Sequence, residues 1–131
     1  MKKDLDSLIL TRQEFQIMKV VWEKGAATVR EVCESISKRK PTAYTTVLTL
    51  MGILEEKGAL SHTRSGRAYI YQPLLSNVQA VHNHIHDVIT RIFDGCPEKL
   101  IENVLEHELN DPEQLEKLRR LVQLRCQQQV A

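Results

Sequence analysis

Apolar residues recur at helical spacing along most of this chain, most clearly in residues 43–57. When residues 43–57 are projected on a helix that turns by about 100° per residue, five apolar side chains share one stripe, which we expect to be buried: Ala43, Val47, Leu50, Met51 and Leu54. Thr45 and Thr49 point the opposite way. We expect a helix that starts near residues 42–44, where a threonine follows a proline, and that ends at Gly58 in a left-handed C-cap.

Two shorter helices are predicted before this one, because each begins with a threonine followed three residues later by a glutamate. Thr11 with Glu14, and Thr28 with Glu31, fit the capping box, in which each side chain satisfies a free backbone donor. Gly25 is expected to end the first helix. Two helices joined by a short turn and followed by the threonine-bearing helix make a helix-turn-helix.

Strand-like alternation follows the third helix, in residues 60–64 and 68–72, with a turn predicted at Ser65-Gly66. An arginine lies on each side of that turn. A helix-turn-helix followed by a basic-tipped hairpin is the layout of a winged helix, in which the third helix enters the major groove and the hairpin lies beside the DNA backbone.

From residue 76 onward the pattern is purely helical, and breaks at Asp94-Gly95 and Asn110-Asp111-Pro112 divide it into three helices. We therefore expect a mainly α chain with a small β-hairpin wing. Its winged helix-turn-helix DNA-binding domain would span residues 1–75, and a C-terminal helical dimerisation domain would span residues 76–131.

Three short amphipathic helices have little core of their own and need a surface to pack against. A second copy of the chain is the economical partner, because two-fold dimers are the commonest oligomers and match palindromic operators. We expect the dimer contact to involve the apolar positions Ile85, Ile89, Ile92, Leu100, Val104, Leu118, Leu121 and Val122.

The outward side of the third helix has threonines and no acid before Glu55, and a Lys-Arg-Lys run precedes it. Hydroxyl groups can bond to base edges, and a carboxylate near the helix start would repel phosphate. We therefore predict DNA contacts at Lys38, Arg39, Lys40, Thr42, Ala43, Tyr44, Thr45, Thr46, Thr49, Arg64 and Arg67. The alternative interpretation is helix caps and solvated charges, and Tyr44 either meets a phosphate or packs on the second helix.

The distribution of charge agrees with a DNA-binding head, residues 1–75, and an acidic tail, residues 76–131. Residues 1–75 hold 12 Lys/Arg against 8 Asp/Glu, and residues 76–131 hold 6 against 9. No apolar run approaches the ~20 residues of a membrane helix, and the N-terminus does not resemble a signal peptide. We expect a cytoplasmic protein with no membrane insertion. Three widely spaced cysteines indicate reduced thiols, and no catalytic motif or cofactor motif is present, so we expect no enzyme.

Histidines 82, 84 and 86 form an H-x-H-x-H pattern on a predicted helix. His82 and His86 lie one turn apart and could share a metal, but no convincing further ligands follow, although Cys96 is a candidate. We therefore predict no metal. The alternative is a metal- or thiol-responsive DNA-binding sensor that uses His82, His84 and His86.

The segments AYTTVLTLMGILEEKGAL and GRAYIYQP resemble the penicillinase and methicillin-resistance repressor family of bacterial winged-helix regulators. The resemblance covers essentially the whole chain and is strongest from Ala43 to Pro73. It implies a transcriptional repressor with an operator DNA partner and a homodimer formed by interlocked C-terminal helices. A glycine-arginine pair recurs at the family's wing, which makes Arg67 the stronger wing contact.

The resemblance also implies a route of release. In antibiotic-responsive members, a membrane sensor protease leads to repressor cleavage after an asparagine and before a phenylalanine. Asn103 lies at the matching place, but the next residue is Val104, so cleavage between Asn103 and Val104 is a hypothesis. Copper-responsive relatives have paired C-x-C motifs near the C-terminus, and this chain has only Cys126 there.

Overall fold

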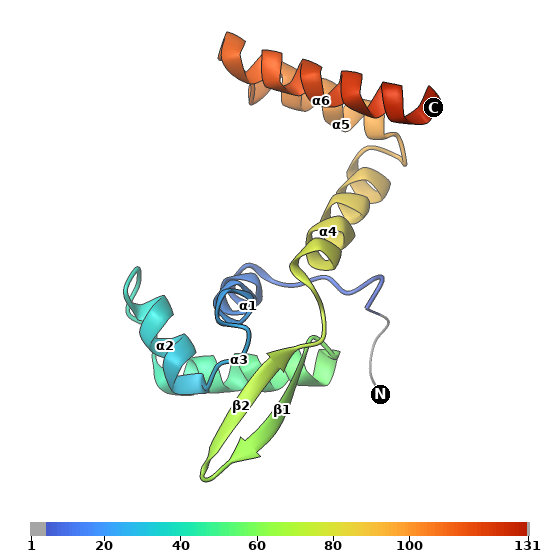
Figure 1. Cartoon of the computed structure of the whole chain (residues 1–131). Helices are drawn as coiled ribbons and strands as arrows, with labels where there is room; N and C mark the ends of the chain where they lie inside the picture. The colour runs from blue at the N-terminus through green and yellow to red at the C-terminus, as the bar shows by residue number, and fades with distance from the viewer. Residues whose placement is uncertain (1–4, 131) are drawn as a thin grey trace. The chain divides into compact units, whose positions relative to one another are not determined.

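The computed structural model describes residues 5–130 (Figure 1). It confirms a mainly helical chain with a two-stranded wing and C-terminal helices. The elements in chain order are α1 (Arg12–Lys24), α2 (Val29–Ser37), α3 (Tyr44–Lys57), β1 (Leu60–Ser65), β2 (Ala68–Pro73), α4 (Asn77–Ile92), α5 (Pro97–His107) and α6 (Pro112–Val130).

Both predicted capping boxes are present. The Thr11 hydroxyl accepts from the backbone N–H of Glu14, and the Glu14 carboxylate accepts from the N–H of Thr11. Thr28 and Glu31 make the same reciprocal pair at the start of α2. Because each box satisfies donors that a helix start leaves free, the first two helices begin where the sequence predicted.

Helix α3 packs Val47, Met51 and Leu54 into the core, and Leu50 is partly buried. Gly58 has a φ of 90° and ends the helix in the left-handed conformation, as predicted. The expectation for Ala43 was wrong: it is exposed, because it is the N-cap residue and lies outside the helical repeat. No side chain caps this helix, since the Thr42 hydroxyl donates instead to the carbonyl of Lys40.

The wing is an antiparallel hairpin in which Leu60 pairs with Pro73 and Ser65 with Ala68. Its turn therefore consists of Gly66 and Arg67, one residue later than the sequence predicted. Gly66 adopts a φ of 63°, which suits glycine as the first central residue of a two-residue turn. The shift places Arg67 in the turn itself.

The core of the head is built from all three helices and the base of the wing. Ala27 joins the wing through a single antiparallel bridge, with hydrogen bonds of 3.0 and 2.8 Å to and from Tyr71. The indole N–H of Trp22 donates to the carbonyl of Leu75 at 2.8 Å. These contacts fix the wing to the helical part of the head, and α3 packs against α1, α2 and β1.

The chain divides after Ile85 into two compact units. In the second, Asp94 and Gly95 both have positive φ and separate α4 from α5, and Pro97 is the first residue of α5. Between residue 84 and residue 129, no described side chain is buried. Within residues 5–130, no helix combines the length and the hydropathy that a membrane span requires.

Candidate nucleic-acid interface

The outward side of α3 is exposed and uncharged over its first turns. Thr45, Thr46 and Thr49 are exposed, and Tyr44 is 51% exposed. The first turn of α3 contains no acidic residue. Leu48 is also exposed on this helix, and the sequence patterns did not single it out. This surface offers hydroxyl donors, hydroxyl acceptors and methyl groups to a partner.

The turn between α2 and α3 is closed by a pair of reciprocal hydrogen bonds. The Ser37 hydroxyl accepts from the N–H of Thr42 at 3.2 Å and donates to its carbonyl at 3.3 Å. The Cys33 thiol approaches the same carbonyl at 3.4 Å. The three basic residues between Ser37 and the start of α3 are exposed: Lys38, Arg39 and Lys40. The turn thus presents a defined basic cluster next to the threonines.

A partly buried ion pair holds the other end of α3. Lys57, in its last turn, donates to a carboxylate oxygen of Glu14 at 2.6 Å, and the Glu14 side chain is 2% exposed. Burial would raise the pKa of Glu14, but the hydrogen bonds from Lys57 and Thr11 outweigh it and hold that pKa below its ordinary value. The pair ties the end of α3 to the start of α1.

The wing is tied to α3 through His62. Its Nδ1 lies 2.7 Å from both carboxylate oxygens of Glu55, and its ring lies against Tyr69 with centroids 4.4 Å apart. At the tip, the Arg64 Nε donates to the carbonyl of Gly66 at 3.1 Å, and Arg67 is exposed. The two predicted wing arginines therefore occupy the same tip.

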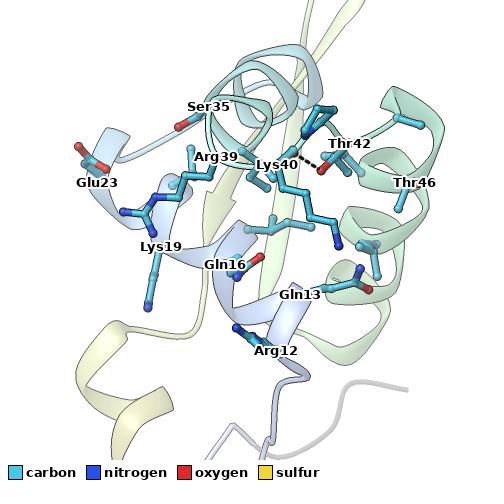
Figure 2. A pocket seen from close by; sticks show the side chains of 17 residues that line it. Arg12, Gln13, Gln16, Lys19, Glu23, Ser35, Arg39, Lys40, Thr42 and Thr46 are labelled. Carbon is cyan, nitrogen blue, oxygen red and sulfur yellow. Dashed lines mark hydrogen bonds between the residues drawn. The ribbon is translucent and has the colours of Figure 1, made fainter.

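A cleft of about 800 Å³ lies between α1, the end of α2 and the start of α3. Figure 2 shows Arg12, Gln13 and Gln16 along one side of it and Lys40 and Thr42 on another. Five predicted DNA contacts line this cleft: Arg39, Lys40, Thr42, Ala43 and Thr46. The remaining predicted contacts do not line it: Lys38 at the end of α2, Tyr44, Thr45 and Thr49 on α3, and Arg64 and Arg67 at the wing tip.

The histidine pattern does not form a cluster of metal ligands. His84 Nε2 accepts from the backbone N–H of Leu10 at 3.2 Å, and its ring meets Phe15 edge-on at 5.4 Å. His82 and His86 are exposed. Within residues 5–130, no group of three or more His, Cys, Asp or Glu side chains could hold a metal ion. His84 thus connects Leu10, two residues before the start of α1, to α4.

The predicted dimer and cleavage residues lie on α4, α5 and α6. Ile85, Ile92, Leu121 and Val122 are exposed, and the others are partly buried: Ile89, Leu100, Val104 and Leu118. Asn103 is exposed on α5, beside the partly buried Val104. The second unit thus leaves several large apolar side chains uncovered.

Comparison with known proteins gives consistent relatives. A family profile described as penicillinase repressor matches residues 10–124. The penicillinase repressor of Bacillus licheniformis is 26% identical over 110 residues, covering 84% of this chain and 86% of that protein. The methicillin resistance regulatory protein MecI of Staphylococcus aureus (strain N315) is 22% identical over 113 residues, covering 86% and 92%. The solution structure of the DNA-binding domain of the repressor BlaI matches with a TM-score of 0.53 at 30% identity, covering 60% of this chain and 93% of that one.

Proposed function

Because this chain belongs to the penicillinase repressor family of winged-helix DNA-binding repressors, we propose that it represses transcription by binding a palindromic operator as a homodimer. The family consists of transcriptional repressors and not of enzymes. The observation that carries the proposal is the exposed, acid-free threonine side of α3, flanked by Lys38, Arg39 and Lys40. Such a surface suits both the bases and the phosphates of a duplex.

In this proposal α3 enters the major groove and Thr45, Thr46 and Thr49 meet base edges. The Lys-Arg-Lys turn and the wing tip bind phosphates on either side. Anchors at both ends of α3 support the role: the Ser37–Thr42 hydrogen bonds before it and the Lys57–Glu14 ion pair at its end. A helix whose ends are fixed loses little further conformational freedom on binding, which favours affinity.

Dimerisation would use the apolar side chains of the second unit. Leu121 is 64% exposed and Ile92 is 56% exposed, and a soluble monomer rarely leaves so many large apolar residues uncovered. A second copy of the chain would cover them and would bring two copies of α3 to half-sites about one DNA turn, ~34 Å, apart.

Release would follow from any signal that weakens the dimer or removes it. Cleavage between Asn103 and Val104 is one such route, and the exposure of Asn103 on α5 supports it. A sensor protease of the kind implied by the family resemblance, incubated with the chain, should yield fragments whose masses map the cut. An intact chain after derepression would exclude this route.

The proposal is tested by selecting genomic fragments that the full chain retains and then measuring their sequence preference by gel shift. We expect recovered fragments to share a palindrome and to bind more tightly than scrambled duplexes of equal length. Recovery of no fragment above background would contradict the proposal. Retention of all sequences with equal affinity would contradict the operator-specific part of it.

A further inference from the structure

Four basic side chains line the cleft between α1 and the α2–α3 turn: Arg12, Lys19, Arg39 and Lys40. Among the residues that the structure describes, Glu23 is the one acidic member of the lining. Within residues 5–130, none of the four cations forms an ion pair, whereas Arg30, Arg91 and Arg119 all pair with a nearby glutamate or aspartate. The cleft therefore has a surplus of positive charge that the protein itself does not neutralise.

The rest of the lining suits an anion as well. Gln13 and Gln16 add uncharged donors beside the cations, as Figure 2 shows. Thr42 is fixed by its hydrogen bonds to Ser37, so Lys40 is attached to a defined backbone. A wall with both cations and neutral donors is the arrangement that protein–DNA interfaces use for phosphate oxygens.

The cleft also adjoins the surface that would meet DNA. Ala43 and Thr46, from the first turns of α3, line its edge. A major groove is about 12 Å wide, so the backbone that borders the groove passes close to residues that flank a helix lying in it. The cations on α1 would then be near a phosphate that α3 itself does not reach.

We propose that this basic cleft is a second phosphate-binding surface, in which Arg12 on α1 and Lys40 on the α2–α3 turn hold the DNA backbone beside the major groove that receives α3. The inference rests on the proposed function. It adds α1 to the DNA-binding elements, and it assigns a role to Arg12, which the sequence patterns did not indicate.

The test compares Arg12→Gln with Lys99→Gln in the full chain, on the best fragment recovered by selection and on a scrambled duplex of equal length. Arg12 and Lys99 are both exposed cations in the first turn of a helix, and only Arg12 lines the cleft. A positive charge near a helix start is unfavourable, so neither change should lower the melting temperature.

For Arg12→Gln we expect a several-fold loss of affinity, equal on both duplexes, and a log-affinity against log-salt slope that is shallower by about one. Arg12→Lys should keep the slope, because it keeps the charge. Lys99→Gln should match the unaltered chain in both respects.

Three results would overturn the inference. In the duplex measurements, Arg12→Gln could behave as Lys99→Gln does, or it could lose affinity for the selected fragment alone. In a separate titration with inorganic pyrophosphate, it could lose pyrophosphate binding while its duplex affinity stays unchanged. The first result, with the unaltered chain still binding its selected fragment, removes the cleft from the interface and leaves the proposed function standing. Failure of the unaltered chain to bind any duplex contradicts the proposed function itself.

Discussion

Thr46 lies where the threonine side of α3 meets the basic cleft, and its exposed hydroxyl is our first choice for a base contact. Thr46→Ala should weaken binding to the selected operator by about 1–3 kcal/mol and relax its sequence preference, as loss of a base contact does. Thr90→Ala, an exposed helical threonine of α4, serves as the control. Competition gel shifts check both variants, and an equal loss on all sequences would reassign Thr46 to the backbone.

Glu14 supports the interface from inside the head. Glu14→Gln should lower the free energy of unfolding by about 1–3 kcal/mol, because it weakens a charge-assisted hydrogen bond to Lys57 in a buried site. Chemical denaturation measures the change. The exposed pair of Arg30 and Glu34 gives the control: Glu34→Gln should change stability by under about 1 kcal/mol. Equal effects of the two variants would show that burial of Glu14 does not matter.

The same carboxylate predicts a pH dependence. The pKa of Glu14 is lower in the folded chain than its ordinary value of 4.5, so its contribution to stability is fully present above that value. The contribution is lost as the pH falls below about 4.5 and through the folded pKa. Glu14→Gln should therefore show a flatter fall in stability than the unaltered chain over this acid range. Parallel curves would contradict the assignment.

At the scale of elements, the sequence predicted the features that depend on residues close together in the chain. Two capping boxes and Gly58 fixed the limits of the helices because each acts within a few residues. The sequence predicts the wing turn one residue too early, because Ser65-Gly66 and Gly66-Arg67 both contain a glycine and only the strand register distinguishes them. The burial of Ala43 was mispredicted because a helical stripe does not say where the helix begins.

Contacts between distant residues could not be read from the sequence. Glu14 and Lys57 are 43 positions apart, and His84 meets the backbone of Leu10 from 74 positions away. Arg12 gave no signal either, because a single arginine at a helix start resembles any solvated charge. Of the candidate site, the sequence predicted the threonine surface and the basic turn, and the structure was needed to show the cleft beside them.

Loosening the turn between α2 and α3 should weaken operator binding while the protein remains folded. Ser37→Ala removes both hydrogen bonds to Thr42 and should lower stability by about 0.5–1.5 kcal/mol for each. We also expect a several-fold loss of operator affinity, because Lys38, Arg39 and Lys40 would lose their fixed backbone. Ser76→Ala, which loses one hydrogen bond at the start of α4, is the control and should leave the affinity of the folded protein unchanged. Equal affinity losses in both would argue against a positioning role for Ser37.

At the scale of the whole molecule, we expect the second unit to determine whether the chain forms a dimer. Beyond Asn83, no described side chain through residue 129 is buried. Leu121→Glu should therefore leave the head folded, convert a dimer to a monomer in sedimentation, and reduce affinity for a palindromic operator more than for a single half-site. Leu74→Glu, at an exposed leucine of the first unit, should leave the dimer intact. A dimer that survives Leu121→Glu would place the interface elsewhere.

The most direct test of the account is the stoichiometry and salt dependence of the complex between the full chain and its selected operator, measured by sedimentation with a labelled duplex. We predict two chains per palindromic duplex, and log affinity that falls linearly with log salt because phosphate contacts release counterions. A single chain per palindrome at full affinity would contradict the dimeric arrangement, and an affinity independent of salt would contradict the proposed phosphate contacts of the basic turn and the wing.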